Sequence, residues 1–233
     1  MRGMILIVLM ALIGAGIAFD KGAWTLPAGW NPWQPLAVED PLTPVTRWKL
    51  GRLEGDREAC LAVLARVPES VLAYAPLADH TPVADCPLEN VVRIERAGVA
   101  FDSSFVAACP LAVAWLRYER HRLQPAAREL FGRSVAAVEH YGSFACRNIY
   151  GREQGRRSLH ATAEALDVAA YRLDDGRRIE VRRDWGDDDA EGKFLRRARQ
   201  GACDAFGSVL GPDYNTAHAD HFHLGVGGYR VCR

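Results

Sequence analysis

The sequence feature that places the strongest constraint on the fold of this chain is a pair of distant groups of potential metal-binding side chains, because one fold must bring both groups together. The first group is His160 and Asp167, and the second, near the C-terminus, consists of His218, Asp220, His221 and His223. Together they use four of the seven histidines. Zinc prefers such nitrogen and oxygen ligands, and a catalytic zinc site needs three protein ligands and an open position for water. His160, Asp167 and one histidine of the second group would meet this need and leave a histidine for the chemistry.

The second group reads as the start of a strand. Because side chains alternate between the two faces of a strand, His221 and His223 fall on the same face and can point at one cleft. Asp220 reaches that cleft only if the strand begins irregularly. A lone histidine in such a segment would be an ordinary polar residue of a half-buried strand. Four histidines and two aspartates in two short groups favour a metal site instead.

These residues carry a resemblance to a known group of enzymes. The pattern Ser158-x-His160-x-x-Ala163-x-Ala165-x-Asp167, followed by His221-x-His223, resembles the paired signature of the LAS metallopeptidases, the lysostaphin-type and D-Ala-D-Ala carboxypeptidase-type peptidoglycan hydrolases. Within that group, the chain from about Trp48 to Arg233 resembles the bacterial extensin-like C-terminal domain family. The segment 211–215, Gly-Pro-Asp-Tyr-Asn, and the closing Cys232-Arg233 are part of this resemblance.

The resemblance implies a role for each matching position. His160, Asp167 and His223 match the ligands of one Zn²⁺ ion per chain, and His221 matches the residue that assists catalysis beside the metal. Asp220 matches the general base, and Arg147 is expected to be the cation that steadies the peptide oxyanion, a role that an arginine near this place fills in related enzymes. Ser158 and His218 are expected to support the site. One departure is Ala163, because the signature usually has glycine there, and an added methyl group could narrow the loop between the ligands.

The resemblance further implies zinc-dependent hydrolysis of peptidoglycan peptide bonds in the cell envelope, by an endopeptidase or a carboxypeptidase. One alternative is a non-catalytic, metal-containing scaffold that binds the cell wall, which the Ala163 departure would favour. Another is a structural wall protein, which predicts proline-rich or tyrosine-rich repeats that the chain lacks. The formal net charge is +0, with 29 basic and 29 acidic residues, so a nucleic-acid partner is not expected.

Residues 1–19 are predicted to be a signal anchor. Met4 to Phe19 is an uninterrupted run of apolar residues and glycine, short for a membrane-spanning helix but within the range of a signal peptide. A poor cleavage site and the tryptophans just downstream favour an uncleaved anchor. The predicted location is therefore the inner membrane, as a single-pass protein with its domain in the periplasm. The alternative is a secreted or periplasmic protein after cleavage.

Residues 20–47 are predicted to be a linker, because they hold five of the twelve prolines and three of the six tryptophans without helical or strand periodicity. Alternatively, this segment wraps the domain as an ordered arm, with Trp30 and Trp33 packed in grooves. Residues 48–233 form the predicted catalytic domain. Its 49% hydrophobic content fits one good-sized core.

Local patterns in this domain predict an α+β fold: a mainly antiparallel sheet with flanking helices and the zinc on the open face of the sheet. Helices are expected over 56–67 after an Asp56 cap, over 111–131 with a break at Pro125, and over 190–210. Strands are expected at 91–95 and 99–101 as a hairpin, at 134–146, at 166–173 and 178–183 around the turn 174–176, and from Asp220.

Six cysteines form an even set in a chain that is predicted to leave the cytosol, which favours disulfides. None lies in a CxxC pair, which argues against thiolate zinc ligands. Order along the chain favours the pairs Cys60–Cys86, Cys109–Cys146 and Cys203–Cys232.

Overall fold

The computed structural model describes residues 4–10, 14, 16, 26–228 and 230–233. Within these residues nine strands form one sheet in the order β1-β4-β5-β6-β7-β10-β9-β11, with β8 paired to β7, while β2 and β3 form a separate hairpin. The strands are β1 (Leu72–Pro76), β2 (His80–Val83), β3 (Cys86–Leu88), β4 (Val91–Ala97), β5 (Val99–Ala108), β6 (Val135–Gly142), β7 (Ala165–Leu173), β8 (Arg178–Glu180), β9 (Ser208–Leu210), β10 (Phe222–Gly225) and β11 (Val231–Cys232).

The α+β class is confirmed, but the expectation of a mainly antiparallel sheet is wrong, because the sheet is mixed. Strand β6 runs parallel to β5, and β11 runs parallel to β9. The chain between β5 and β6 is helical, and a crossover of this kind returns the chain in the same direction, whereas a tight hairpin reverses it. Two parallel pairs thus interrupt the antiparallel pairings.

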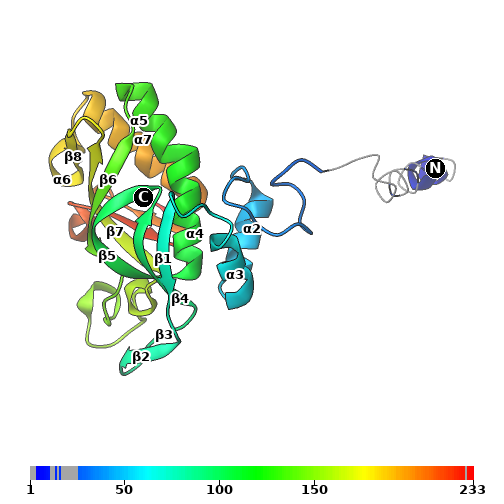
Figure 1. The fold of residues 1–233 in the computed structure, drawn as a ribbon, viewed down its shortest axis with the longest axis horizontal. Helices are drawn as coiled ribbons and strands as arrows, with labels where there is room; N and C mark the ends of the chain where they lie inside the picture. The colour runs from blue at the N-terminus through cyan, green and yellow to red at the C-terminus, as the bar shows by residue number, and fades with distance from the viewer. Residues whose placement is uncertain (1–3, 11–13, 15, 17–25, 229) are drawn as a thin grey trace.

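The helices on the sheet form the main core. They are α4 (Cys109–Tyr118), the π-helical turn η1 (Glu119–Leu123), α5 (Gln124–Phe131), α6 (Val181–Asp184) and α7 (Ala190–Ala205). Figure 1 shows α4 and α5 running end to end along the sheet with α7 beside α5. Side chains of α4 and α7 form one buried cluster with Leu166, Val168 and Leu224 of the sheet. This cluster covers one face of β7 and β10.

Several local expectations are confirmed. Helix α3 (Arg57–Leu64) begins at Asp56, whose side chain accepts a hydrogen bond from the Ala59 amide. Strands β4 and β5 form the expected hairpin, and Gly98 takes the positive φ of +73° that its turn needs. The break near Pro125 is the π-helical turn η1. The helix expected over 190–210 is too long, because α7 ends at Ala205 and residues 208–210 form the strand β9 between β10 and β11.

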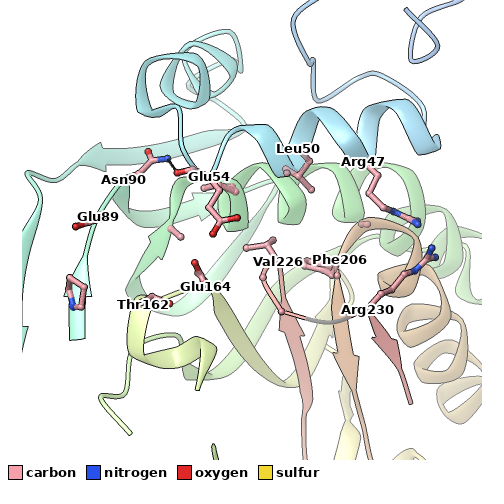
Figure 2. Close-up of a pocket in the computed structure, with 18 residues that line it drawn as sticks. Arg47, Leu50, Glu54, Glu89, Asn90, Thr162, Glu164, Phe206, Val226 and Arg230 are labelled. Carbon is pink, nitrogen blue, oxygen red and sulfur yellow. Dashed lines mark hydrogen bonds between the residues drawn. The ribbon is translucent and has the colours of Figure 1, made fainter. Parts of the chain in front are cut away.

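The segment before the domain packs on the core over part of its length. Helix α2 (Pro44–Arg52) begins within the predicted linker, and Leu36 and Val38 are buried in the main cluster. Trp30 and Trp33 are 51% and 75% exposed. One side of α2 lines a pocket against the domain (Figure 2).

No helix among the described residues is long and apolar enough to span a membrane. Much of the predicted anchor, namely residues 1–3, 11–13, 15 and 17–19, lies outside the described residues.

All six cysteines are among the described residues, and they form the disulfides Cys60–Cys109, Cys86–Cys146 and Cys203–Cys232. The third pair confirms its prediction, whereas the pairs Cys60–Cys86 and Cys109–Cys146 are wrong. The reason is that α3, which carries Cys60, packs on α4, which begins at Cys109. Order along the chain is a poor guide to distance in space once helices dock on one another.

Candidate metal centre

Two of the predicted ligands are direct neighbours in the sheet. Strands β7 and β10 pair in a register that places His223 opposite Asp167. The residues on either side of Asp167, Leu166 and Val168, belong to the core beneath the helices. Because side chains alternate along a strand, Asp167 and His223 project from the opposite face of the sheet. The expected open face is therefore where these two side chains lie.

The third predicted ligand, His160, lies on a short 3-10 turn, η3 (Leu159–Thr162), just before β7. Ser158 caps this turn, and its hydroxyl accepts a hydrogen bond from the His160 amide. The His160 ring is buried, and its Nδ1 lies 3.1 Å from the carbonyl oxygen of Ser143. A carbonyl can only accept, so Nδ1 carries a proton, and Nε2, which faces Asp167, is the nitrogen that would bind a metal ion.

The three side chains converge tightly. His160 Nε2 lies 3.1 Å from His223 Nδ1 and 3.1 Å from Asp167 Oδ2, while His223 Nδ1 lies 2.9 Å from Asp167 Oδ1. One ligand atom from each residue lies within 4.8 Å of the others. Burial opposes ionisation of Asp167, but hydrogen bonds from His160 and His223 outweigh it and hold the pKa of this carboxyl well below its usual range.

This donor set fits a zinc ion. Two imidazole nitrogens and a carboxylate are the ligand types of catalytic zinc sites, and the His160–Ser143 contact is the kind of outer hydrogen bond that fixes a ligand histidine. The set leaves a coordination position for water or substrate. His160, Asp167 and His223 are thus the residues that would hold the ion.

The two other predicted reacting residues form a pair beside this cluster. His221 Nδ1 lies 2.9 Å from Asp220 Oδ1, and His221 Nε2 lies 3.6 Å from Asp167 Oδ1. Asp220 and His221 precede β10, in agreement with an irregular start of the strand. The Asp220 carboxylate therefore contacts Nδ1 of the His221 ring, while Nε2 of the same ring faces the three candidate ligands.

The cluster opens into a cleft of about 530 Å³. Arg147, Tyr150 and Tyr214 line this cleft together with the histidines. The Asn215 side-chain amide donates to the Tyr150 hydroxyl at 3.0 Å, and the Tyr150 and Tyr214 hydroxyls are 3.4 Å apart. Sequence reasoning missed both tyrosines. Tyr214 had a signal, since it lies within the segment 211–215 that carries the resemblance, but nothing in the sequence pointed to Tyr150.

His218 also lines the cleft, where it was expected as a supporting residue. Its Nδ1 lies 2.8 Å from the side-chain oxygen of Asn215. Burial lowers the pKa of His218 to about 4, and the neighbouring His221 and His223 act in the same direction. His218 is therefore neutral at pH 7 and can donate a hydrogen bond to Asn215 without adding charge to the cleft.

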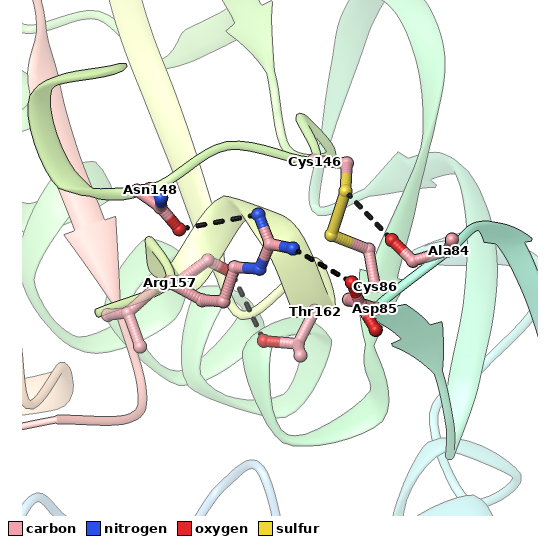
Figure 3. The surroundings of a disulfide bond; sticks show 8 residues. Ala84, Asp85, Cys86, Cys146, Asn148, Arg157 and Thr162 are labelled. Carbon is pink, nitrogen blue, oxygen red and sulfur yellow. Dashed lines mark hydrogen bonds and ion pairs between the residues drawn. A yellow bond between two sulfur atoms is a disulfide. The ribbon is translucent and has the colours of Figure 1, made fainter. Parts of the chain in front are cut away.

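The loop that carries Arg147 is held at its base by a disulfide. Cys146 is bonded to Cys86 of β3, and Figure 3 shows Arg157 beside this bridge. The Arg157 guanidinium contacts Asn148 at 3.3 Å and the Asp85 carboxylate at 3.6 Å. These contacts join both ends of the loop to the β2–β3 hairpin.

The alanine that replaces the usual glycine occupies a left-handed backbone conformation. Ala163 has φ 54° and ψ 30°, is fully buried, and packs with Leu88 and Val91. Glycine adopts this conformation without penalty, which explains its use in the signature, whereas alanine costs about 1–2 kcal/mol there. The methyl group is accommodated in a small apolar cluster with the residues around the β3–β4 turn.

Ala163→Gly is therefore expected to change the free energy of unfolding by less than about 1 kcal/mol. Relief of the left-handed strain is offset by the lost burial of a methyl group, about 0.8 kcal/mol, and by the greater chain entropy of glycine when unfolded. Urea unfolding measures the change, and zinc content should stay the same. A large gain in bound zinc would show instead that the methyl group distorts the ligand loop.

The fold and cluster define an α+β protein with a buried two-histidine, one-aspartate constellation at the base of a cleft. The family model for the extensin-like protein C-terminus matches residues 58–233, most of the chain. The chain belongs to this family. Comparisons with curated proteins and with solved structures gave no match.

Proposed function

We propose that this protein is a zinc-dependent hydrolase of peptidoglycan peptide bonds. The observation that carries the proposal is the convergence of His160, Asp167 and His223 on one buried point beside the pair Asp220–His221. Each element of metal-assisted hydrolysis has a candidate: three ligands, an acid–base pair and an open cleft. The resemblance of both motifs to the LAS metallopeptidases supports peptidoglycan peptides as the substrate class.

A zinc ion bound by these ligands supplies Lewis-acid chemistry, which polarises a peptide carbonyl and acidifies water. The chain itself provides proton transfer through His221 Nε2, the nitrogen that faces the cluster, while Asp220 holds the proton on Nδ1. The sequence predicted Asp220 itself as the base, and the hydrogen bond between the two residues supports a shared role. Arg147 lines the cleft as a cation for the developing oxyanion.

The proposed location is the periplasm, with the N-terminal segment as a membrane anchor or a cleaved signal. The three disulfides support an oxidising compartment, because such bonds are rare in the cytosol. Fractionation and thiol labelling of the expressed protein test this point.

The function is tested by digesting purified peptidoglycan and defined muropeptides with the zinc-loaded protein and locating the cut bond by mass spectrometry. Hydrolysis of a stem or cross-link peptide that a chelator abolishes and zinc restores is the expected result. If the zinc-loaded protein cleaves no muropeptide yet sediments with peptidoglycan sacculi, the wall-binding scaffold is the correct function.

Asp220→Asn is expected to keep its zinc, because Asp220 is not one of the predicted ligands. It should slow hydrolysis by ~10²-fold or more, because it removes the carboxylate of the proposed acid–base pair. His221→Ala should also keep zinc and be at least as slow. If the two residues act as a unit, the double variant is no slower than His221→Ala alone, since effects within one unit are not additive. Losses that multiply in the double variant would instead assign separate roles to the two residues.

A further inference from the structure

A second cavity, of about 340 Å³, lies between helix α2 and the segment that joins two of the predicted ligands. On one side, Arg47, Leu50 and Glu54 line it, and their spacing places them on one face of α2 and the turn after it. On the other side lie Thr162 and Glu164, together with residues 226–228 and 230 from the chain after β10. Figure 2 shows Arg47, Leu50 and Glu54 on one side of the cavity, and Glu164, Val226 and Arg230 on the other.

One end of the cavity is basic. Figure 2 shows the guanidinium groups of Arg47 and Arg230 close together at this end. Arg47 donates from Nη2 to the Asp204 carbonyl at 2.9 Å, and its Nε is buried without an acceptor. Burial lowers the pKa of Arg47 and the charge of Arg230 lowers it further, while Asp204 opposes both. Within the described residues, neither arginine has a carboxylate at ion-pair distance, so this end favours an anion.

The other end is acidic. Glu164 faces Glu54 across the cavity in Figure 2. Burial raises the pKa of Glu164; a hydrogen bond from Thr162 opposes this, and the charge of Glu54 adds to it. Among the residues that the structure describes, no lysine, arginine or histidine forms an ion pair with Glu164. A cation placed here would relieve both the burial and the repulsion between the two carboxylates.

Apolar side chains separate the two ends. Leu50, Phe206 and Val226 lie between the basic and the acidic groups (Figure 2). We propose that this cavity binds a short uncapped peptide, with its ammonium group at Glu164 and its carboxylate at Arg47. The volume lies at the lower end of the range for small-molecule sites, which suits a ligand of this size.

The position of the cavity couples it to the candidate metal centre. Gly227 and Gly228 line both the cavity and the metal cleft, and the Val226 amide donates to the Glu164 carbonyl at 3.0 Å. Glu164 itself lies between the ligands His160 and Asp167 in the chain. A ligand that orders this segment changes the affinity of the metal centre, and zinc changes the affinity of the cavity by the same factor.

The test is isothermal titration calorimetry of the full chain with uncapped dialanine and trialanine. Saturable binding of at least one of these probes is expected. N-acetylation, which removes the ammonium charge, and C-terminal amidation, which removes the carboxylate, should each weaken the bound probe about tenfold or more, since each abolishes a charge-assisted contact. If neither uncapped peptide binds at millimolar concentration, the proposal is overturned.

Two variants locate the binding. Glu164→Gln should weaken the uncapped probe but leave the N-acetylated probe unchanged, and Arg47→Gln should weaken the uncapped probe but leave the amide unchanged. The control Glu39→Gln, at an exposed position that does not line the cavity, should alter neither. Equal weakening of every probe by a variant would indicate a damaged fold and would overturn the assignment of the two ends.

The result can be separated from the zinc proposal by repeating the titration with His160→Ala. Binding should persist in this variant, although its affinity shifts. If His160→Ala abolishes binding while Glu164→Gln and Arg47→Gln leave it intact, the probe occupies the metal cleft and the second cavity is not the site.

Discussion

The wild-type protein, purified without chelator, is expected to carry about one zinc ion per chain, and His160→Ala is expected to lose most of it. His160 is one of three proposed ligands. The loss of a residue that only hydrogen-bonds to a ligand lowers metal affinity by about 10–100-fold, so the loss of a ligand itself should lower the zinc affinity by ~10²-fold or more. Elemental analysis of the two proteins gives the answer, and peptidoglycan hydrolysis should disappear with the metal.

The matched control is His80→Ala. His80 is exposed on β2, away from the cluster, and its Nδ1 contacts the carbonyl of Ala78 at 2.9 Å. This variant should keep its zinc.

Thermal unfolding adds a readout that does not depend on activity. Zinc at roughly 1,000 times its dissociation constant stabilises a protein by about 4 kcal/mol, so a chelator should lower the melting temperature of the wild type but not that of His160→Ala. Full metal content in a folded His160→Ala protein would contradict the ligand assignment.

Removal of the Cys60–Cys109 disulfide, in the double variant Cys60→Ala/Cys109→Ala, should lower the free energy of unfolding by about 4 kcal/mol. The bridge closes a loop with a sequence separation of 49 residues, and the entropy that it removes from the unfolded chain sets this magnitude. Both cysteines are fully buried between α3 and α4, so lost packing acts in the same direction. Urea unfolding of wild type and variant measures the loss.

The double variant Cys203→Ala/Cys232→Ala provides a comparison. Its loop is shorter, with a separation of 29 residues, and Cys232 is exposed, so the loss should be smaller. Tryptic mapping without reductant checks the connectivity, because Arg66 and Arg93 place Cys60, Cys86 and Cys109 on different peptides. A peptide pair that joins Cys60 to Cys86 would contradict the structure.

The candidate ligands were predictable from local sequence patterns. The types and spacing of His160, Asp167 and His223 predicted that they would meet, and the structure places them together. The Asp56 cap and the turn at Gly98 were also predictable, because each depends on a few neighbouring residues whose conformational preferences act locally.

The failures involve contacts between distant segments. The partner of Cys60, the parallel pairing of β5 with β6 and the strand at residues 208–210 all depend on how helices and strands dock. Docking is decided by the burial of whole faces, to which many residues contribute small amounts, so no short motif records it.

The sequence by itself determined which side chains are available to this protein: two histidines and an aspartate as candidate metal ligands, Asp220 and His221 as a candidate acid–base pair, and the local turns that present them. Only the tertiary structure decided what these groups contact. In the folded chain Asp220 hydrogen-bonds to His221, and the hydroxyl groups of Tyr150 and Tyr214 are neighbours. Ala163 adopts a left-handed conformation, and a cavity with charged ends lies between α2 and the loop that carries His160. Side-chain type is a property of one residue, whereas proximity between residues far apart in the chain arises only when the entropy of closing the intervening loops is overcome by burial.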